Sequence, residues 1–246
     1  MDLLIGTLVL RPYVFGFLAA FLVAGVRDLG WRRILIFGAW VWPVAWVAEF
    51  ASTRLGVPFG LYHYTGDTRG RELFIANVPF MDSLSFTFLA YAAFCLARVA
   101  LRGRRVPGAA VALAAGVLMM ALDVVIDPLA VRGDRWFLGR IFYYPDGGVY
   151  FGVPLSNFLG WVIVGAAGVG GYLALAGDAA GREPRGGVTL YYAVAVFNLA
   201  VTVWIGEWVL AAVGLALHGV LALTLRWLNQ SVEVPVGFGG RGIENA

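Results

Sequence analysis

The fold of this chain is decided by long apolar stretches such as residues 108–130, GAAVALAAGVLMMALDVVIDPLA. A helix of this length crosses the roughly 30 Å hydrocarbon core of a bilayer. Beyond this stretch, the 246-residue chain is 61% hydrophobic and only 13% charged, whereas a soluble domain carries about 25% charged residues. The sequence therefore predicts an all-α protein, a polytopic transmembrane helical bundle.

Other apolar runs supply the rest of the bundle. We expect one transmembrane domain over residues 1–231, with seven helices near 10–26, 34–51, 79–100, 108–130, 153–176, 188–205 and 208–228. The last two are separated only by Gly206-Glu207, and without that break one long, bent helix leaves a bundle of six. A start of the first helix at Leu3 would leave Arg11 to snorkel to the membrane interface. Residues 232–246 are rich in glycine and should form a flexible tail.

The loops differ in charge and length, which predicts the topology. Short loops after the first, third and fifth helices carry clustered arginines and should face the cytoplasm. The opposite loops, 52–78 and 131–152, are longer and rich in Gly, Pro and Tyr. We therefore expect an integral protein of the cytoplasmic (inner) membrane with its N-terminus outside and its C-terminus inside. The sequence does not specify an oligomeric state.

The residues that are missing exclude several classes of function. All 18 basic residues are arginines, so no lysine can form a retinal Schiff base. Two histidines, His63 and His218, are too few for a histidine-rich di-iron site. No Gly-rich phosphate loop follows a strand, and no long basic face tracks a nucleic-acid backbone. With a single cysteine, Cys95, a thiolate metal cluster is also excluded. We expect no cofactor and no nucleic-acid partner.

Four acids fall inside the predicted helices, where each costs at least roughly 2.5–3.5 kcal/mol at the bilayer centre. At 1.5 Å per residue, Glu49 and Asp123 each lie about 23 Å from the cytoplasmic ends of their helices. Asp127 lies about 6 Å further along its helix. Asp82 and Asn157 lie about 5 Å into helices that begin on the opposite side. Four helices should therefore bring polar side chains to the outer third of the bilayer.

The acid pair is suited to proton transfer. Asp123 and Asp127 are four residues apart and share one helix face. Burial and like-charge repulsion oppose ionisation of both, so one acid can stay protonated and act as a general acid. The structural alternatives are pairing with loop arginines such as Arg132 or Arg135 and, for Asp82, capping of a helix end.

A Mg²⁺ site is the competing chemistry, because several carboxylates can hold a hard cation. The spacing Asp123-x3-Asp127 supplies only two acids, whereas prenyl-transfer enzymes show the tighter DDxxD pattern. We therefore assign no metal ligand.

Aromatic residues surround the acids. Trp46 shares a helix face with Glu49. Four more candidate substrate-binding aromatics lie near the same side of the membrane: Tyr62, Tyr64, Tyr150 and Trp161. They could form an interfacial belt or line a pocket whose ring faces tolerate a carbocation.

Several short motifs follow one another along residues 8–176: Arg11-Pro12-Tyr13-Val14-Phe15, Glu49, Gly56-Val57-Pro58-Phe59-Gly60-Leu61-Tyr62-His63-Tyr64-Thr65, Val78-Pro79-Phe80-Met81-Asp82-Ser83, Asp123-x3-Asp127-Pro128, and Tyr150-Phe151-Gly152-Val153-Pro154-x2-Asn157-Phe158-x-Gly160-Trp161. In this order they resemble the CruF-type integral-membrane carotenoid hydratases, a family that includes γ-carotene 1′-hydratases and bisanhydrobacterioruberin hydratases. The last two predicted helices contribute little to the resemblance.

The resemblance implies a cofactor-independent hydro-lyase. It would add water across a terminal carbon–carbon double bond of an acyclic carotenoid end group and give a tertiary alcohol. The carotenoid would come from the lipid phase, so membrane lipids and the substrate are the expected partners.

The roles of the residues are our own hypothesis. Asp123 or Asp127 would protonate the double bond, and Glu49 or Asp82 would orient the attacking water. Asn157 would hydrogen-bond that water, and Tyr62 or Tyr64 would line the access route. Two other classes of function stay open: a non-catalytic carotenoid- or lipid-binding membrane protein, and a Mg²⁺-dependent prenyl-transfer enzyme.

Overall fold

The computed structural model describes residues 2–177 and 184–230. The predicted tail, residues 232–246, lies outside them. The described chain is almost entirely helical: α1 (Leu3–Leu10), α2 (Pro12–Leu29), α3 (Trp31–Leu55), α4 (Phe80–Ala100), α5 (Gly108–Ala130), α6 (Leu155–Ala176), α7 (Arg185–Trp204) and α8 (Trp208–Gln230). Seven of these helices, α2 to α8, are long and apolar enough to cross a membrane. The predicted seven-helix bundle is therefore confirmed, and the chain is an integral membrane protein.

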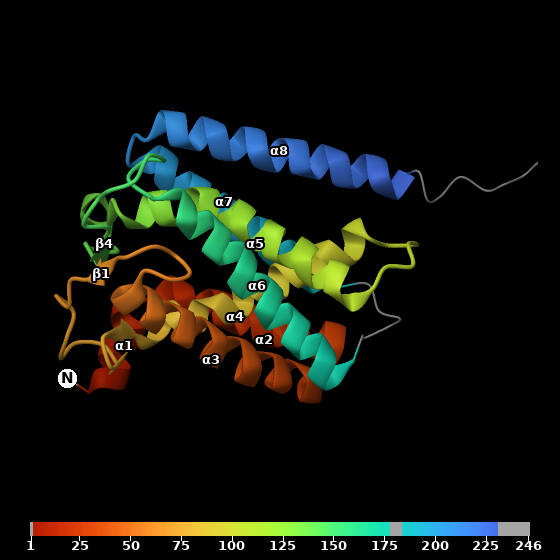
Figure 1. Ribbon diagram of the computed structural model, residues 1–246, viewed down its shortest axis with the longest axis horizontal. Helices are drawn as coiled ribbons and strands as arrows, with labels where there is room; N and C mark the ends of the chain where they lie inside the picture. The colour runs from red at the N-terminus through yellow and green to blue at the C-terminus, as the bar shows by residue number, and fades with distance from the viewer. Residues whose placement is uncertain (1, 178–183, 231–246) are drawn as a thin grey trace, which may run out of the picture.

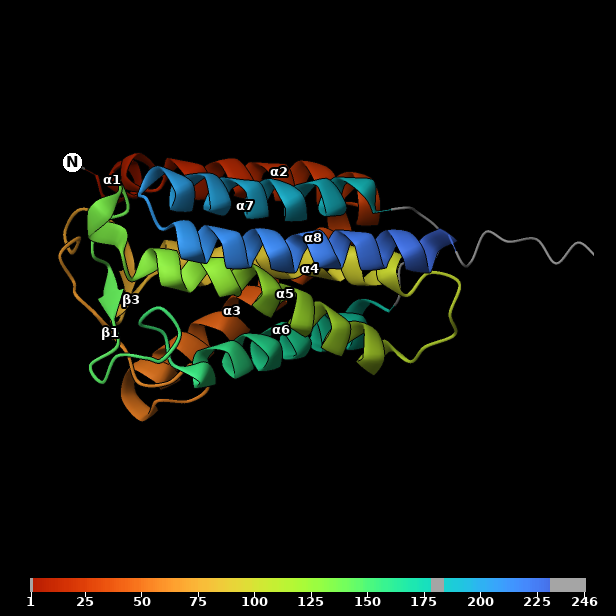
Figure 2. The same ribbon diagram turned by 90° about the horizontal axis from the view of Figure 1, so that it is seen from above.

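The helices run up and down in one bundle (Figure 1). Helices α2, α4 and α6 finish at one end of the bundle, and the longer connections after α3 and α5 lie at the other end, with α1 (Figure 2). We call this second end the loop end. The arginine-rich loops after α2 and α4 lie at the opposite end, and the predicted orientation in the membrane stays a prediction.

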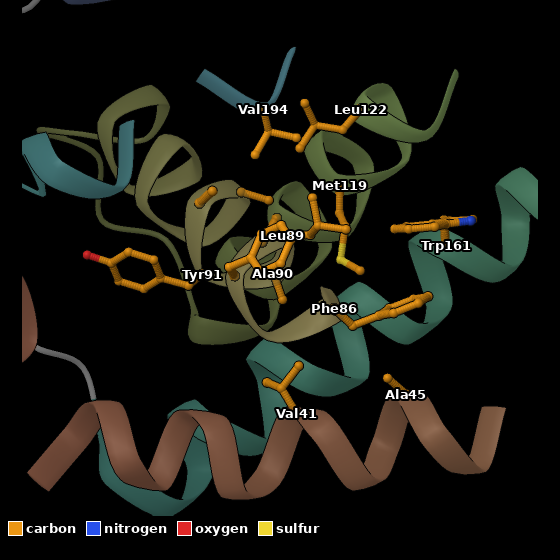
Figure 3. Packing of buried hydrophobic residues seen from close by; sticks show 14 of the residues in the cluster. Val41, Ala45, Phe86, Leu89, Ala90, Tyr91, Met119, Leu122, Trp161 and Val194 are labelled. Atoms are coloured by element: carbon orange, nitrogen blue, oxygen red, sulfur yellow. The ribbon is translucent and has the colours of Figure 1, made fainter. Parts of the chain in front are cut away.

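Helix α4 forms the centre of the bundle because the side chains of its middle part, residues 86–97, are almost all apolar. Residues 86–97 of α4 are all buried, and the helix packs against α2, α3, α5 and α7. Figure 3 shows Leu89 and Ala90 surrounded by side chains from neighbouring helices. A helix that is hydrophobic all round is expected in such a central position.

The six-helix alternative is wrong, because α7 and α8 are separate helices. The chain turns at Gly206, whose φ of 78° is in the left-handed region that glycine adopts readily. The interaction of Arg135 with the Glu207 carboxylate then ties this turn to the loop after α5.

The prediction that Arg11 snorkels to the interface is also wrong. A helix does begin at Leu3, but it ends at Leu10, and α2 starts at Pro12. Arg11 lies at this break with only 1% of its surface exposed. Its side chain points inward because it forms an ion pair with the buried Glu72. The pairing of these two residues could not be inferred from the sequence.

Helices α5 and α6 approach closely because glycines face each other. A Cβ on Gly116 would lie 2.3 Å from the Val162 carbonyl oxygen, and a Cβ on Gly165 would lie 2.9 Å from the Gly116 Cα. Small residues of this kind allow helix backbones to meet in membranes. This contact sets the spacing of the polar side chains further along both helices.

Two pairs of short antiparallel strands organise the loop end. β1 (His63–Tyr64) pairs with β4 (Phe142–Tyr143), and β2 (Phe74–Ile75) pairs with β3 (Val78–Pro79). A short 3-10 helix, Gly133–Arg135, follows α5. The pairing of β1 with β4 joins the loop after α3 to the loop after α5 and places their aromatic residues over the bundle.

Candidate active site

A pocket with about 900 Å³ of empty space, part of it open to the outside, lies in the loop-end half of the bundle. Its polar lining includes side chains from five helices, α3 to α7: Glu49, Asp82, Ser85, Asp127, Asn157 and Asn198. The rest of the lining is mostly aromatic, including Tyr13, Phe17, Phe59, Tyr62, Tyr64, Phe86, Phe88, Trp136, Phe142, Tyr144, Trp161 and Phe197. The structure thus brings together the helices that the depth argument placed in one layer.

The acid pair on α5 is held by α6. Asn157 Nδ2 donates to Oδ2 of Asp123 and to Oδ2 of Asp127, each at 2.7 Å. Trp161 Nε1 also donates to Asp127 Oδ2, at 3.3 Å. Asp123 is fully buried, whereas Asp127 is partly exposed and lines the pocket. Asp123 therefore lies behind Asp127 as seen from the pocket.

Two further acids reach the pocket from α3 and α4. Glu49 Oε2 and Asp82 Oδ2 are buried and have no hydrogen-bond partner among the described residues. The two carboxyl groups also interact with each other. Leaving such oxygens unpaired is costly, so they mark a site where a polar ligand or water would be bound favourably.

Neither pairing with the loop arginines nor helix capping accounts for the positions of the pocket acids. Asp82 lies in the first turn of α4, but its Oδ2 caps no backbone group. The loop arginines have other partners. Arg132 donates to the Phe151 carbonyl oxygen, and both Arg132 and Arg135 pair with Glu207. The pocket acids are therefore not neutralised by these arginines.

Stacked rings form the wall beside the acids. The Phe86 and Trp161 rings are parallel within 16°, with centroids 4.5 Å apart (Figure 3). Phe59 lies against both rings. Because Trp161 also donates to Asp127, this wall and the acid pair form one unit.

Tyrosines from the loops cover the pocket. Tyr62 packs against Tyr64 and Tyr144, and the Tyr64 hydroxyl interacts with Glu49. Burial, followed by the nearby Glu49, raises the pKa of the Tyr62 and Tyr64 hydroxyls well above the ordinary value. Burial, followed by Asp127, likewise raises the pKa of Tyr144. All three hydroxyls therefore stay neutral and able to donate.

An ion pair is buried next to the pocket. Arg11 Nη2 donates to Glu72 Oε1 at 2.8 Å, and Arg11 Nε donates to Glu72 Oε2 at 3.2 Å. Arg11 Nη1 donates to the Leu138 carbonyl oxygen at 2.9 Å. The pair was not predictable from the sequence, because Glu72 lies in a loop whose path the sequence does not specify. The Arg-Pro dipeptide at a helix break was the available signal.

The predicted site residues divide into two groups. Glu49, Asp82, Asp127, Asn157, Tyr62, Tyr64 and Trp161 line the pocket, and Asp123 adjoins it. Trp46 and Tyr150 do not line it. Trp46 Nε1 donates to the Ile75 carbonyl oxygen at 3.4 Å, and the Tyr150 hydroxyl donates to the Val124 carbonyl oxygen at 3.2 Å.

Two contributions to the pocket were not anticipated. Both side-chain N–H groups of Asn157 face carboxylates, so only its amide oxygen is left for a ligand. Helix α7, which added little to the sequence motifs, supplies Val194, Phe197 and Asn198 to the lining.

Within residues 2–177 and 184–230, no group of three or more His, Cys, Asp or Glu side chains is arranged to hold a metal ion.

Fold and site together define an integral membrane protein with an acid-lined aromatic pocket. Residues 5–222 match the model of a family described as "carotenoid biosynthesis protein". The chain belongs to this family.

A curated relative carries a more specific name. Bisanhydrobacterioruberin hydratase of Haloarcula japonica is 28% identical over 148 residues, which cover 60% of this chain and 47% of the relative. The match thus spans about half the length of that protein. No solved structure matches the chain significantly.

Proposed function

We propose that this protein is a carotenoid hydratase that adds water across a terminal double bond of an acyclic carotenoid end group. The observation that carries the proposal is the pocket itself, in which a hydrogen-bonded acid pair, unpartnered carboxyl oxygens and stacked rings face one apolar space. Membership of the carotenoid biosynthesis family and the similarity to a bacterioruberin-type hydratase support it.

Asp127 is the proton donor in this proposal. Its carboxyl group lies beside that of Asp123, and Asn157 bridges the two. Oδ2 of both acids accepts from Asn157 Nδ2, so two negative charges would lie close together, and in this proposal the pair holds one proton. Asp127 faces the pocket and would transfer that proton to the terminal alkene carbon. Asp123 and Asn157 would hold Asp127 in place.

Protonation leaves a tertiary cation and the Asp127 carboxylate. The faces of Phe86 and Trp161 would stabilise the cation. A water held by Glu49 or Asp82 then forms the new C–O bond and gives a proton to that carboxylate. The sum is alkene plus water to tertiary alcohol, with no oxidant or reductant. Return of the proton to Asp127 through water completes the cycle.

The substrate would enter from the lipid phase, because a long polyene partitions into the bilayer. With the N-terminus outside, the loop end would face the outer surface of the cytoplasmic membrane, where water is available. A carotenoid lying across the bilayer could thus place its end group at the acids while its chain stays among lipids.

The test is pigment analysis. The chain is expressed in a host that accumulates an acyclic carotenoid, the pigments are separated, and the molecular mass of each is measured by mass spectrometry. We expect products that have gained one water per reacting end, with activity that survives treatment with EDTA. Pigment that co-purifies without any change of mass would contradict the proposal and favour a carotenoid-binding protein. Activity that EDTA abolishes and that consumes a prenyl diphosphate would favour prenyl transfer.

A further inference from the structure

The pocket has a second aromatic wall, which has no part in the steps above. Six lining residues come from α2 and α7: Tyr13, Val14, Phe17, Val194, Phe197 and Asn198. We call them the α2–α7 wall. Helices α2 and α7 pack against each other on one side of α4, and α3 and α6 pack against each other on another side (Figure 2). The α2–α7 wall therefore lies on a different side of the pocket from Trp161 of α6.

The α2–α7 wall suits a flat, apolar ligand. The Tyr13 ring stacks on the Phe197 ring, with centroids 5.3 Å apart and planes within 18°, and Phe17 meets Phe197 edge-on at 5.5 Å. Asn198 is polar, but its Nδ2 donates to the Val194 carbonyl oxygen of its own helix at 2.9 Å. Aromatic rings bind other π systems by dispersion and by offset or edge contacts. A conjugated hydrocarbon chain would find such contacts here.

Ring contacts lead from this wall to the apolar surface of the protein. On the inner side, Phe17 contacts the buried Phe88 of α4, with centroids 5.6 Å apart. On the outer side, Tyr13 contacts Phe137, and Phe137 contacts Trp204 at the end of α7. Phe137 and Trp204 are 53% and 66% exposed. Exposed aromatic rings near a helix end lie at the membrane interface. The rings thus connect the pocket with the lipid.

Other sides of the pocket are closed more firmly. Trp42 of α3 donates to Ser83 of α4 at 3.1 Å, and Asn157 joins α6 to the acids of α5. At their other end, α2 and α7 touch so closely that a Cβ on Gly186 would lie 2.7 Å from the Ala24 Cβ. At the loop end, large rings space the same two helices, and rings can turn about their side-chain bonds. The loop-end part of the α2–α7 contact is therefore the side best able to admit a chain.

We infer that the α2–α7 wall is the binding subsite for the conjugated chain of the substrate, which extends between α2 and α7 into the lipid. This inference rests on the proposed hydratase function and deepens it. The end group would lie at Asp127, beside the Phe86–Trp161 stack, while the polyene passes Phe17 and Phe197. The wall then recognises the chain, and the acids act on the end group.

Two variants and two substrates provide the test. Phe17→Leu and Phe197→Leu each remove one ring and keep an apolar side chain. The substrates are an acyclic carotenoid and a short acyclic isoprenoid that has the same isopropylidene end group but no conjugated chain. We expect KM for the carotenoid to rise roughly 3- to 10-fold in each variant, with kcat within about twofold of the wild type. The kinetics of the short substrate should not change. Equal losses for both substrates would assign the rings to packing and overturn the inference.

Phe21→Leu is the matched control. It changes another buried ring of α2, one turn along, which packs against Phe37 and Tyr91 and does not line the pocket. This variant should leave KM for both substrates unchanged. If either F17L or F197L does not accumulate, the other decides alone: an unchanged KM for the carotenoid then overturns the inference.

A binding measurement separates this inference from the proposed function. D127N should bind carotenoid without hydrating it, so pigment can be measured per amount of protein purified from the carotenoid-making host. We expect F17L or F197L, added to D127N, to lower the retained pigment roughly 3- to 10-fold, and F21L to leave it unchanged. A wild type that adds no water ends the proposed function, although retention that depends on Phe17 and Phe197 would still support the subsite. Hydration by the wild type with retention indifferent to both rings ends the inference alone.

Discussion

Two acid sites lie at opposite ends of the bundle, and they differ in what surrounds the carboxyl group. At the end opposite the loop end, Asp28 Oδ2 accepts from the Tyr91 hydroxyl at 2.6 Å and from the Gly187 backbone N–H at 3.1 Å. At the loop end, Glu49 Oε2 and Asp82 Oδ2 accept from no described group. Both sites are buried, so burial alone does not distinguish a structural acid from a reactive one.

Packing explains the difference. Around Asp28, a Cβ on Gly186 would lie 2.7 Å from the Ala24 Cβ, and a Cβ on Gly187 would lie 2.3 Å from the Cys95 Sγ. The helices are closely packed here, and the carboxylate joins α2 and α4 to the first turn of α7, where a negative charge is favourable. At the loop end, aromatic rings keep a space open beside the acids. An acid with unpaired oxygens and an adjoining cavity is the candidate for chemistry.

The sharpest test of this comparison is Asp127→Asn. It keeps the shape and the hydrogen-bond acceptor but cannot donate a carboxylic proton. We expect hydration to fall by about 10² to 10⁴-fold, measured as alcohol formed per amount of folded protein, with an unchanged melting temperature within a few degrees. Asp123→Asn should also lower the rate, because the shared proton loses one holder. Full activity in both variants would overturn the assignment of the acid.

The aromatic wall should have a smaller effect. Phe86→Leu keeps an apolar side chain but removes the ring that stacks on Trp161. Loss of a cation–π contribution of about 1–2 kcal/mol corresponds to a roughly 5- to 30-fold lower rate. Phe94→Leu, which changes a buried ring away from the pocket lining, is the matched control. Equal losses of rate in both variants would assign the effect to packing.

Asp28→Asn should affect stability and not chemistry. Replacing the charged acceptor of two hydrogen bonds is expected to cost about 1–3 kcal/mol in the free energy of unfolding. The measurement is thermal unfolding in detergent, with the hydration rate per folded protein as its companion. A normal melting temperature with a lost rate would place a second reactive site at this end.

Trp46→Phe should change least. The indole lies outside the pocket, stacks on Phe50 and donates one hydrogen bond to a backbone carbonyl group. We expect a rate within about threefold of the wild type and a loss of stability of about 1 kcal/mol or less. A large increase in KM for this variant would instead support the substrate-binding role that the sequence indicated.

The helices and the layer of acids were predictable from sequence because both depend on local patterns. The length of each apolar stretch predicts a membrane-spanning helix. The helical rise of about 1.5 Å per residue then gives the depth of Glu49, Asp82 and Asp127 in the membrane. The helices expected to begin near residues 79 and 153 correspond to α4 and α6, where Pro79 and Pro154 are the residues before the first turn.

The remaining features depend on contacts between distant segments. Arg11 and Glu72 are 61 residues apart and are joined by the fold of a loop. Trp46 shares a helix face with Glu49, but the indole reaches the loop near Ile75 and not the pocket. Asp28 adjoins Arg27 in the sequence, and nothing local indicates that Gly187 comes close enough to donate to it. Sequence periodicity places a side chain on a helix, but it does not give its partners.

The contact between Gly116 and Gly165 has a consequence for how the reaction rate can be tuned. A single methyl group at Gly116 would meet the Val162 carbonyl oxygen, and α5 would have to shift away from α6. Asp127 would then be displaced from Asn157 although no polar group had been altered. The position of Asp127, the proposed proton donor, thus depends on the absence of side chains about two to three turns away, and substitutions at this glycine contact are expected to change the proposed reaction from a distance.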